Sequence, residues 1–117
     1  MHDFRKLRVY QRALNLTRHV RCSTLGFPAD ELYGLTSQFR RASYSIVLNI
    51  AEGAGNQSEK EFARFLQIAM RSGYECLGCL DIARVNELMP ETEMISLEAE
   101  TKEIISMLVG LKRSLVK

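Results

Sequence analysis

The feature that most constrains the fold is a run of side chains near the end of the chain, spaced alternately three and four residues apart. The positions are Met94, Leu97, Thr101, Ile104, Leu108, Leu111 and Leu115. This alternation puts all of them on one stripe of an α-helix, and it is the seam of left-handed helix packing. Because such a stripe must be covered by other helices, the sequence predicts a helical bundle.

Two earlier segments have apolar positions at helical spacing. They are bounded by Gly26-Phe27-Pro28 and by the stretch from Gly53 to Gln57, which are typical helix breakers. For the first segment, residues 5–24, the predicted buried positions are Leu7, Tyr10, Leu14 and Thr17. For the second, residues 31–52, they are Leu35, Phe39, Ala42, Ile46 and Ile50.

The third segment has the clearest helix start. Ser58 followed by Glu61 forms a capping box, in which the serine hydroxyl caps the helix and the glutamate reaches back to the serine N–H. Helical spacing then continues from Phe62 to about Leu88, where Met89-Pro90 ends it. The four segments and their short connectors predict an all-α fold, an antiparallel up-down-up-down four-helix bundle, with residues 1–117 as a single domain.

Composition agrees with a small folded domain. The chain has 117 residues, of which 46% are hydrophobic, enough for a core. No apolar stretch is long enough for the hydrophobic region of a signal sequence or for a membrane span. The three cysteines are an odd number in a chain that needs no disulfides, which is typical of a reducing compartment. We therefore expect a cytoplasmic protein with no membrane partner.

Basic side chains are concentrated at the beginning of the chain. Between Asp3 and Asp30 there is no acidic residue, and this asymmetry favours a polyanionic partner, RNA or DNA. Guanidinium groups bind phosphate without reading the base sequence. The predicted nucleic-acid-binding residues are Arg5, Arg8, Arg12, Arg18, Arg21 and Arg40, with His19 beside them. The alternative is a solvated helix face, because this basic run matches no known nucleic-acid recognition motif.

A polar cluster lies within about a quarter turn on the second helix. It comprises Gln38, Arg41, Ser45, Asn49 and Glu52. It contains no histidine or cysteine that could pair as nucleophile and base, so we predict a subunit or helix contact rather than an enzyme with a small-molecule substrate. Apolar residues outside the seam of the last helix favour an alternative function, a protein-interaction scaffold; these are Ile105, Met107, Val109 and Val116.

Two other patterns are weak. His19-x2-Cys22 and Cys76-x2-Cys79 contain four residues of the types that bind zinc, but both pairs fall in the middle of predicted helices. Gly53-Ala54-Gly55 precedes a helix start but has no P-loop lysine. We predict no metal and no cofactor.

Several motifs resemble one known family. The segment SQFRRASYSIVLNIAEG (residues 37–53), FRKLRVYQRA (residues 4–13), Phe27-Pro28 with ELYGL (residues 31–35), and FARFLQIA (residues 62–69) occur in the family's order. The chain thus resembles the bacterial four helix bundle proteins, first known as products of intervening sequences in 23S ribosomal RNA genes. It departs from the family pattern at Val47, where a proline is usual, and at Arg71, where a glycine is common.

The resemblance implies a homo-oligomer, typically a pentamer, without enzymatic activity. Relatives also resemble the accessory proteins of diversity-generating retroelements, which implies a reverse transcriptase as a possible protein partner. The identity of the partner, and the choice between RNA and DNA, stay open at this point.

Overall fold

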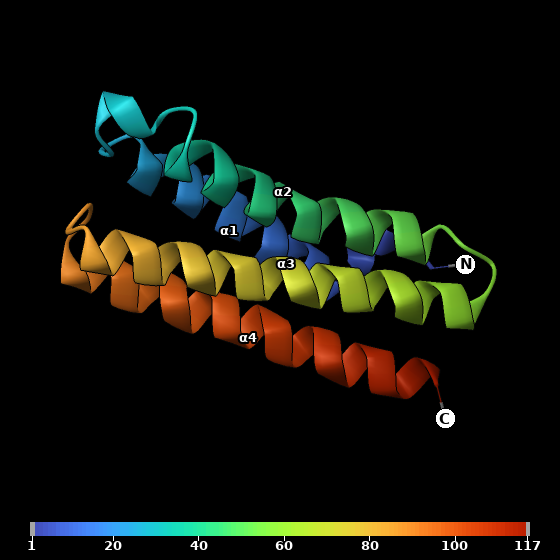
Figure 1. Ribbon diagram of the computed structural model, residues 1–117. Coiled ribbons are helices and arrows are strands. Elements are labelled where there is room, and N and C mark those ends of the chain that lie inside the picture. Colours follow the sequence, from blue (N-terminus) through green and yellow to red (C-terminus); the bar gives the residue numbers. More distant parts are fainter. Residues whose placement is uncertain (1, 117) are drawn as a thin grey trace.

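A computed structural model describes residues 2–116 and has four long helices packed side by side (Figure 1). The helices are α1 (Arg8–Thr24), α2 (Leu35–Ala54), α3 (Glu59–Val85) and α4 (Glu91–Leu115). Two short 3-10 helices, η1 (Phe4–Lys6) and η2 (Ala29–Glu31), precede α1 and α2. Residues 2–116 contain no strand, and none of their helices is long and apolar enough to cross a membrane.

Neighbouring helices run in opposite directions. Arg12 in α1 pairs with Glu103 in α4, whereas His19, further along α1, pairs with Glu93, which comes earlier in α4. The chain reverses at each connector, as the colours in Figure 1 show. The contacts between helices join α1 to α2, α2 to α3, α3 to α4, and α4 back to α1. The predicted four-helix bundle is confirmed.

The core follows the predicted faces of α2 and α4. All five predicted positions of α2 are buried, and α4 buries its seam from Met94 to Leu108, with Leu111 and Leu115 partly buried. Ile105, expected to lie outside the seam as interaction surface, is instead buried against α3, where Gly73 leaves room for it. Its apolar side chain is therefore part of the α3–α4 contact.

The prediction for α1 was wrong in its start and only partly right in its buried face, since Leu7 and Tyr10 pack partly buried against the core. Leu7 has extended backbone angles, so α1 begins at Arg8, and Arg5 lies in η1. Leu14, predicted to be buried, is 43% exposed. The buried residues are Val9, Ala13, Leu16, Val20 and Thr24. They also follow helical spacing, and packing between α2 and α4 determines which of the two overlapping stripes faces inward.

The start of α3 agrees with the prediction in part. The Ser58 hydroxyl accepts a hydrogen bond from the Glu61 N–H at 3.2 Å, which caps the helix. The second half of the capping box is replaced, because the Glu61 carboxylate accepts from Arg64 at 3.0 and 3.2 Å. The helix therefore begins where the sequence indicates, with a different partner for the glutamate.

Helix α2 ends within the predicted glycine stretch, at Ala54 with Gly55 as its C-cap, so Gly53 lies inside the last turn. A Cβ atom at Gly53 would lie 2.6 Å from the Phe65 Cβ and 3.0 Å from Cδ1 of Phe62. The glycine allows α2 and α3 to approach closely near the connector between them.

Candidate nucleic-acid interface

One flank of the basic helix α1 is neutralised by α4. The Arg12 guanidinium donates from Nη1 to Glu103 Oε1 at 2.6 Å. This hydrogen bond raises the pKa of Arg12 and lowers that of Glu103, because it stabilises both charged forms. Arg12, one of the six predicted phosphate-binding residues, thus already has an anionic partner within its own chain.

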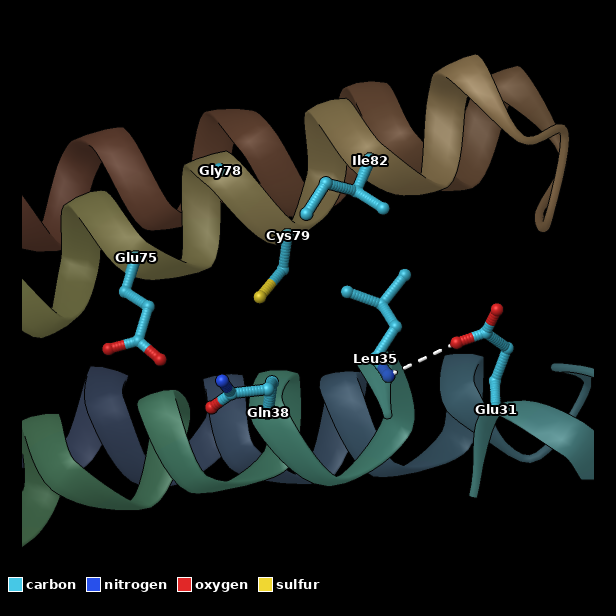
Figure 2. A pocket seen from close by; sticks show the side chains of 7 residues that line it. All are labelled: Glu31, Leu35, Gln38, Glu75, Gly78, Cys79 and Ile82. Carbon is cyan, nitrogen blue, oxygen red and sulfur yellow. Dashed lines mark hydrogen bonds between the residues drawn. The ribbon is translucent and has the colours of Figure 1, made fainter. Parts of the chain in front are cut away.

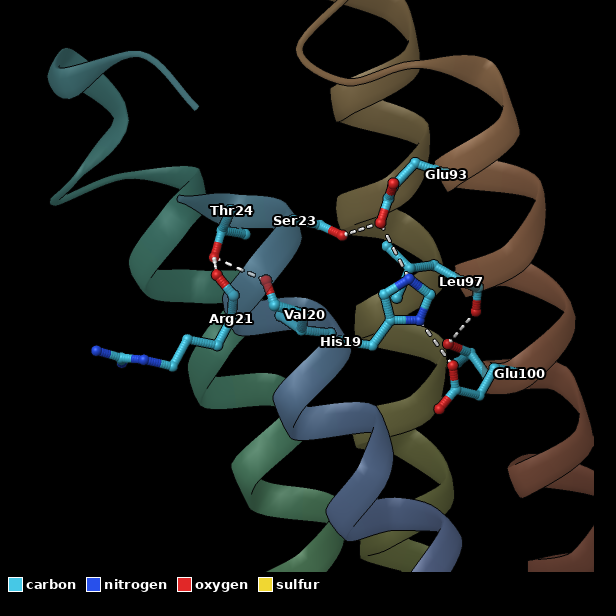
Figure 3. Close-up of polar contacts among 9 residues, drawn as sticks. His19, Val20, Arg21, Ser23, Thr24, Glu93, Leu97 and Glu100 are labelled. Carbon is cyan, nitrogen blue, oxygen red and sulfur yellow. Dashed lines mark hydrogen bonds and ion pairs between the residues drawn. The ribbon is translucent and has the colours of Figure 1, made fainter. Parts of the chain in front are cut away.

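His19 lies on the same flank, between two carboxylates of α4 (Figure 3). Its Nδ1 is 2.8 Å from Glu100 Oε2, and its Nε2 is 3.1 Å from Glu93 Oε1. The Ser23 hydroxyl also donates to Glu93, at 2.7 Å. The hydrogen bond from Ser23 and then that from His19 lower the pKa of Glu93. This polar cluster fastens the second half of α1 to α4.

The remaining glutamates of α4 are engaged on its other flank. Arg84 of α3 lies 3.5 Å from Glu91 and 3.9 Å from Glu98, and Glu98 also pairs with Lys102 at 3.3 Å. Every glutamate of α4 therefore has a cationic or histidine partner in this chain.

The other flank of α1, next to α2, has arginines without carboxylate partners. Among residues 2–116, Arg18, Arg21 and Arg40 form no ion pair; Arg18 and Arg21 are exposed and Arg40 is half-buried. Arg41 forms none either, but it lies on the side of α2 towards α3, where it lines a hollow with Glu75. Figure 3 shows the Arg21 side chain extending away from His19 and α4. Arg40 reaches across from α2 and donates from Nε to Thr24 Oγ1 at 2.9 Å. The structure thus brings Arg21 and Arg40 to the same end of the α1–α2 groove.

The first two predicted arginines lie apart from this group. Arg5 is in η1, with its guanidinium 4.6 Å from the centre of the Phe4 ring, and Arg8 begins α1. Thirteen residues of helix, about 20 Å, separate Arg8 from Arg21. The six predicted residues therefore form two groups and one internal ion pair rather than a single stripe.

The sequence reasoning missed an aromatic residue beside the arginines. Tyr44 is 38% exposed and lines a hollow of about 240 Å³ between α1 and α2, with Leu14, Thr17, Val47 and Leu48. It follows Arg40 by four residues and Arg41 by three, so all three lie along one side of α2. That spacing is visible in the sequence, so Tyr44 could have been predicted as a neighbour of these arginines.

The predicted polar cluster of α2 divides between the α2–α3 contact and the surface. The Ser72 hydroxyl donates to Ser45 Oγ at 2.8 Å, and Asn49 Nδ2 donates to the Ser45 carbonyl at 2.8 Å and to its hydroxyl at 3.0 Å. Gln38, Arg41 and Glu52 are exposed. Ser45 and Asn49 therefore belong to a helix junction, whereas the three exposed side chains are available to a partner.

A mostly apolar hollow lies next to this cluster, between the beginning of α2 and the second half of α3 (Figure 2). Its volume is about 440 Å³, and it is lined by Glu31, Leu35, Gln38, Glu75, Gly78, Cys79 and Ile82. Glu31 holds the helix start there by accepting from the Leu35 N–H at 3.2 Å. Ile82 is 52% exposed, so this hollow presents apolar surface to solvent.

The residues considered for zinc binding are not gathered into one site. Cys76 and Cys79 are buried in α3, whereas Cys22 is exposed on α1. Burial raises the pKa of Cys79 to about 11 and raises that of Cys76 as well. Within residues 2–116, no group of three or more His, Cys, Asp or Glu side chains is arranged so that it could hold a metal ion.

Comparison with protein families gives a decisive match. The family model of the 23S rRNA-intervening sequence proteins matches residues 5–110, which include α1 to α3 and most of α4. The chain belongs to this family. Its fold is also similar to a crystal structure of a protein of unknown function from the S23 ribosomal protein family of Bacteroides thetaiotaomicron. That similarity has a TM-score of 0.81 at 23% sequence identity, over 90% of this chain and 95% of the other.

A comparison with curated proteins gave no match. Membership of the family confirms the resemblance seen in the sequence.

Proposed function

We propose that this 23S rRNA-intervening sequence protein is a non-enzymatic homo-oligomer that binds RNA or DNA through arginines of its first helix and of the adjoining face of α2. The observation that supports the proposal is the unequal pairing of cations on the two flanks of α1. Arg12 and His19 are held by carboxylates of α4, while Arg18 and Arg21 have no acidic partner among residues 2–116. A polyanion would supply the missing partners.

Binding through arginines favours phosphate contacts over base reading. A guanidinium group binds phosphate oxygens in bidentate fashion, and phosphates carry no sequence information. We therefore expect affinity that tolerates changes of sequence and falls steeply with salt, because bound counterions are released from the nucleic acid. An oligomer would repeat the arginines and raise the affinity through avidity.

The hollow between α2 and α3 supports the oligomeric part of the proposal. Leu35, Cys79 and Ile82 line it, and exposed apolar surface of this kind marks interaction sites. Light scattering at micromolar concentration tests this part, with an oligomer as the expected result. A monomer would contradict it.

The chemistry of the nucleophilic side chains favours a binding role. Burial raises the pKa of Cys79 to about 11, so its thiol stays protonated at neutral pH. Both ring nitrogens of His19 are within hydrogen-bond distance of glutamates, which leaves neither free to act as a base on a substrate.

A gel-shift titration with a labelled oligonucleotide over a salt series tests nucleic-acid binding. We expect binding at about 50 mM salt that weakens by orders of magnitude at about 200 mM, the behaviour of proteins with several phosphate contacts. The double variant Arg18→Gln, Arg21→Gln should bind more weakly and show a shallower salt dependence. Wild-type protein that leaves the oligonucleotide unshifted at low salt would contradict the proposal.

A protein-interaction scaffold is the second candidate, favoured by the same apolar hollow between α2 and α3. The gel shift separates the two, because a scaffold without nucleic-acid binding leaves the oligonucleotide unshifted, and an Ile82→Lys variant tests whether assembly uses this hollow. A scaffold that uses this hollow should lose its assembly with the variant, whereas nucleic-acid binding by single subunits through the α1–α2 face should remain.

A further inference from the structure

We propose that the hollow beside Tyr44 is a stacking site for an unpaired base, so that the ligand class of the α1–α2 face is single-stranded nucleic acid. This inference rests on the proposed function and adds a location and a strand preference to it. It follows from an exposed ring, the apolar walls beside it and the arginines next to it.

The ring lies between two hollows. The first has a volume of about 240 Å³ and lies between α1 and α2, where Leu14, Val47 and Leu48 form its apolar walls. The second, about 430 Å³, continues over the outer surface of α2, where Arg41 and Asn49 line it together with Tyr44. Apolar surface next to a partly exposed aromatic ring suits the flat face of a base.

The charges around the ring favour a polyanionic strand. Arg41 lines the same hollow as Tyr44, and Arg40, one turn before it on α2, is held at the groove by its hydrogen bond to Thr24. Glu52 lies at the opposite end of the outer hollow, about 12 Å of helix beyond Tyr44. Since a carboxylate repels phosphate, the flanking phosphates are expected towards Arg40 and Arg21, away from Glu52.

An unpaired strand fits this site better than a duplex. The bases of a duplex are stacked within it, whereas those of a single strand can be splayed out onto an aromatic side chain. A second copy of the chain is a weaker candidate for the occupant, because it would have to supply carboxylates to these arginines. All the glutamates of α4, the most acidic helix, are already engaged within the chain.

The test is fluorescence anisotropy with a labelled 20-nucleotide single-stranded RNA, the DNA of the same sequence, and the corresponding duplex. The key variant is Tyr44→Leu, which keeps an apolar side chain and removes the ring. Tyr44→Phe restores the ring, and Arg71→Gln, at an exposed arginine of α3, is a matched control for loss of charge on another face. Circular dichroism checks that each variant keeps its helical content.

We expect Tyr44→Leu to weaken single-strand binding by about 5- to 150-fold, the range for loss of one stacked base. Duplex binding should change less than about twofold, and Tyr44→Phe should bind like wild type. Arg41→Gln should weaken the binding of both single strands and duplex, whereas Arg71→Gln should weaken neither. Comparing RNA with DNA shows which strand the site takes.

Two results would overturn the inference while leaving the proposed function standing. One is the result that wild-type protein binds single strands and the Tyr44→Leu variant binds them with the same affinity. The other is Tyr44→Leu protein that loses its oligomeric state, which would make the hollow a contact between copies. Wild-type protein that binds no oligonucleotide at low salt would overturn the proposed function together with this inference.

Discussion

Replacing Gly53 with alanine should destabilise the bundle, although alanine is the better helix former. Gly53 lies in the last turn of α2, where a Cβ would be 2.6 Å from the Phe65 Cβ and 3.3 Å from the Phe62 carbonyl oxygen. Neither atom is at the end of a flexible side chain, so the methyl group requires α2 and α3 to move apart. The predicted effect is therefore a loss of packing over the α2–α3 contact.

The size of the effect is the difference between two opposing contributions. Overpacking of a well-packed contact costs about 1–3 kcal/mol. Alanine recovers about 1 kcal/mol of helix propensity relative to glycine. The expected net change at Gly53 is therefore a destabilisation of up to about 2 kcal/mol.

The chain contains its own control. Gly110 lies within α4 with open space where a Cβ would be added. Alanine at this position should stabilise the protein by about 0.5–1 kcal/mol, because only the propensity contributes. Urea unfolding followed by circular dichroism measures both variants. The reasoning fails if Gly53→Ala is as stable as Gly110→Ala.

Three further predictions concern the helix cap, acid stability and the thiols. Ser58→Ala should cost about 1 kcal/mol in urea unfolding, since it removes the N-cap of α3; an unchanged midpoint would show that the cap contributes nothing. The hydrogen bonds from Ser23 and His19 lower the pKa of Glu93 below its ordinary 4.5, so their stabilisation is complete above that pH and is lost as the pH falls through the lowered pKa. Glu93→Gln should therefore flatten the acid side of the stability profile, and an identical profile would count against the cluster. With Ellman's reagent the exposed Cys22 should react at once and the two buried cysteines only after denaturant is added; three fast thiols would contradict the burial.

The bundle could be predicted from sequence because its signals are local. The seam from Met94 to Leu108 faces the core as expected, and the serine at position 58 does cap α3. Each of these features depends on residues a few positions apart, which helical periodicity places on one face or at one helix end.

The buried face of α1 could not be predicted in the same way. Leu14 belongs to one helical stripe and Leu16 to another, and both stripes satisfy the same spacing. The structure buries Leu16, because that stripe is enclosed by α2 and α4. Only the arrangement of the neighbouring helices distinguishes the two.

The candidate site required the structure for the same reason. Arg12 and Glu103 are 91 residues apart, so no local pattern shows that this arginine is neutralised. Tyr44 and Leu14 line one hollow although they belong to different helices. The sequence could identify the basic helix, and the packing decided which of its arginines remain without an acidic partner.

Photo-crosslinking of a bound oligonucleotide, followed by mass spectrometry of the linked peptides, tests the central claim most directly. The account predicts crosslinks within residues 14–24 of α1 and residues 40–48 of α2, concentrated at Tyr44. Crosslinks confined to α3 and α4, or to the flank of α1 that carries Arg12, would contradict it.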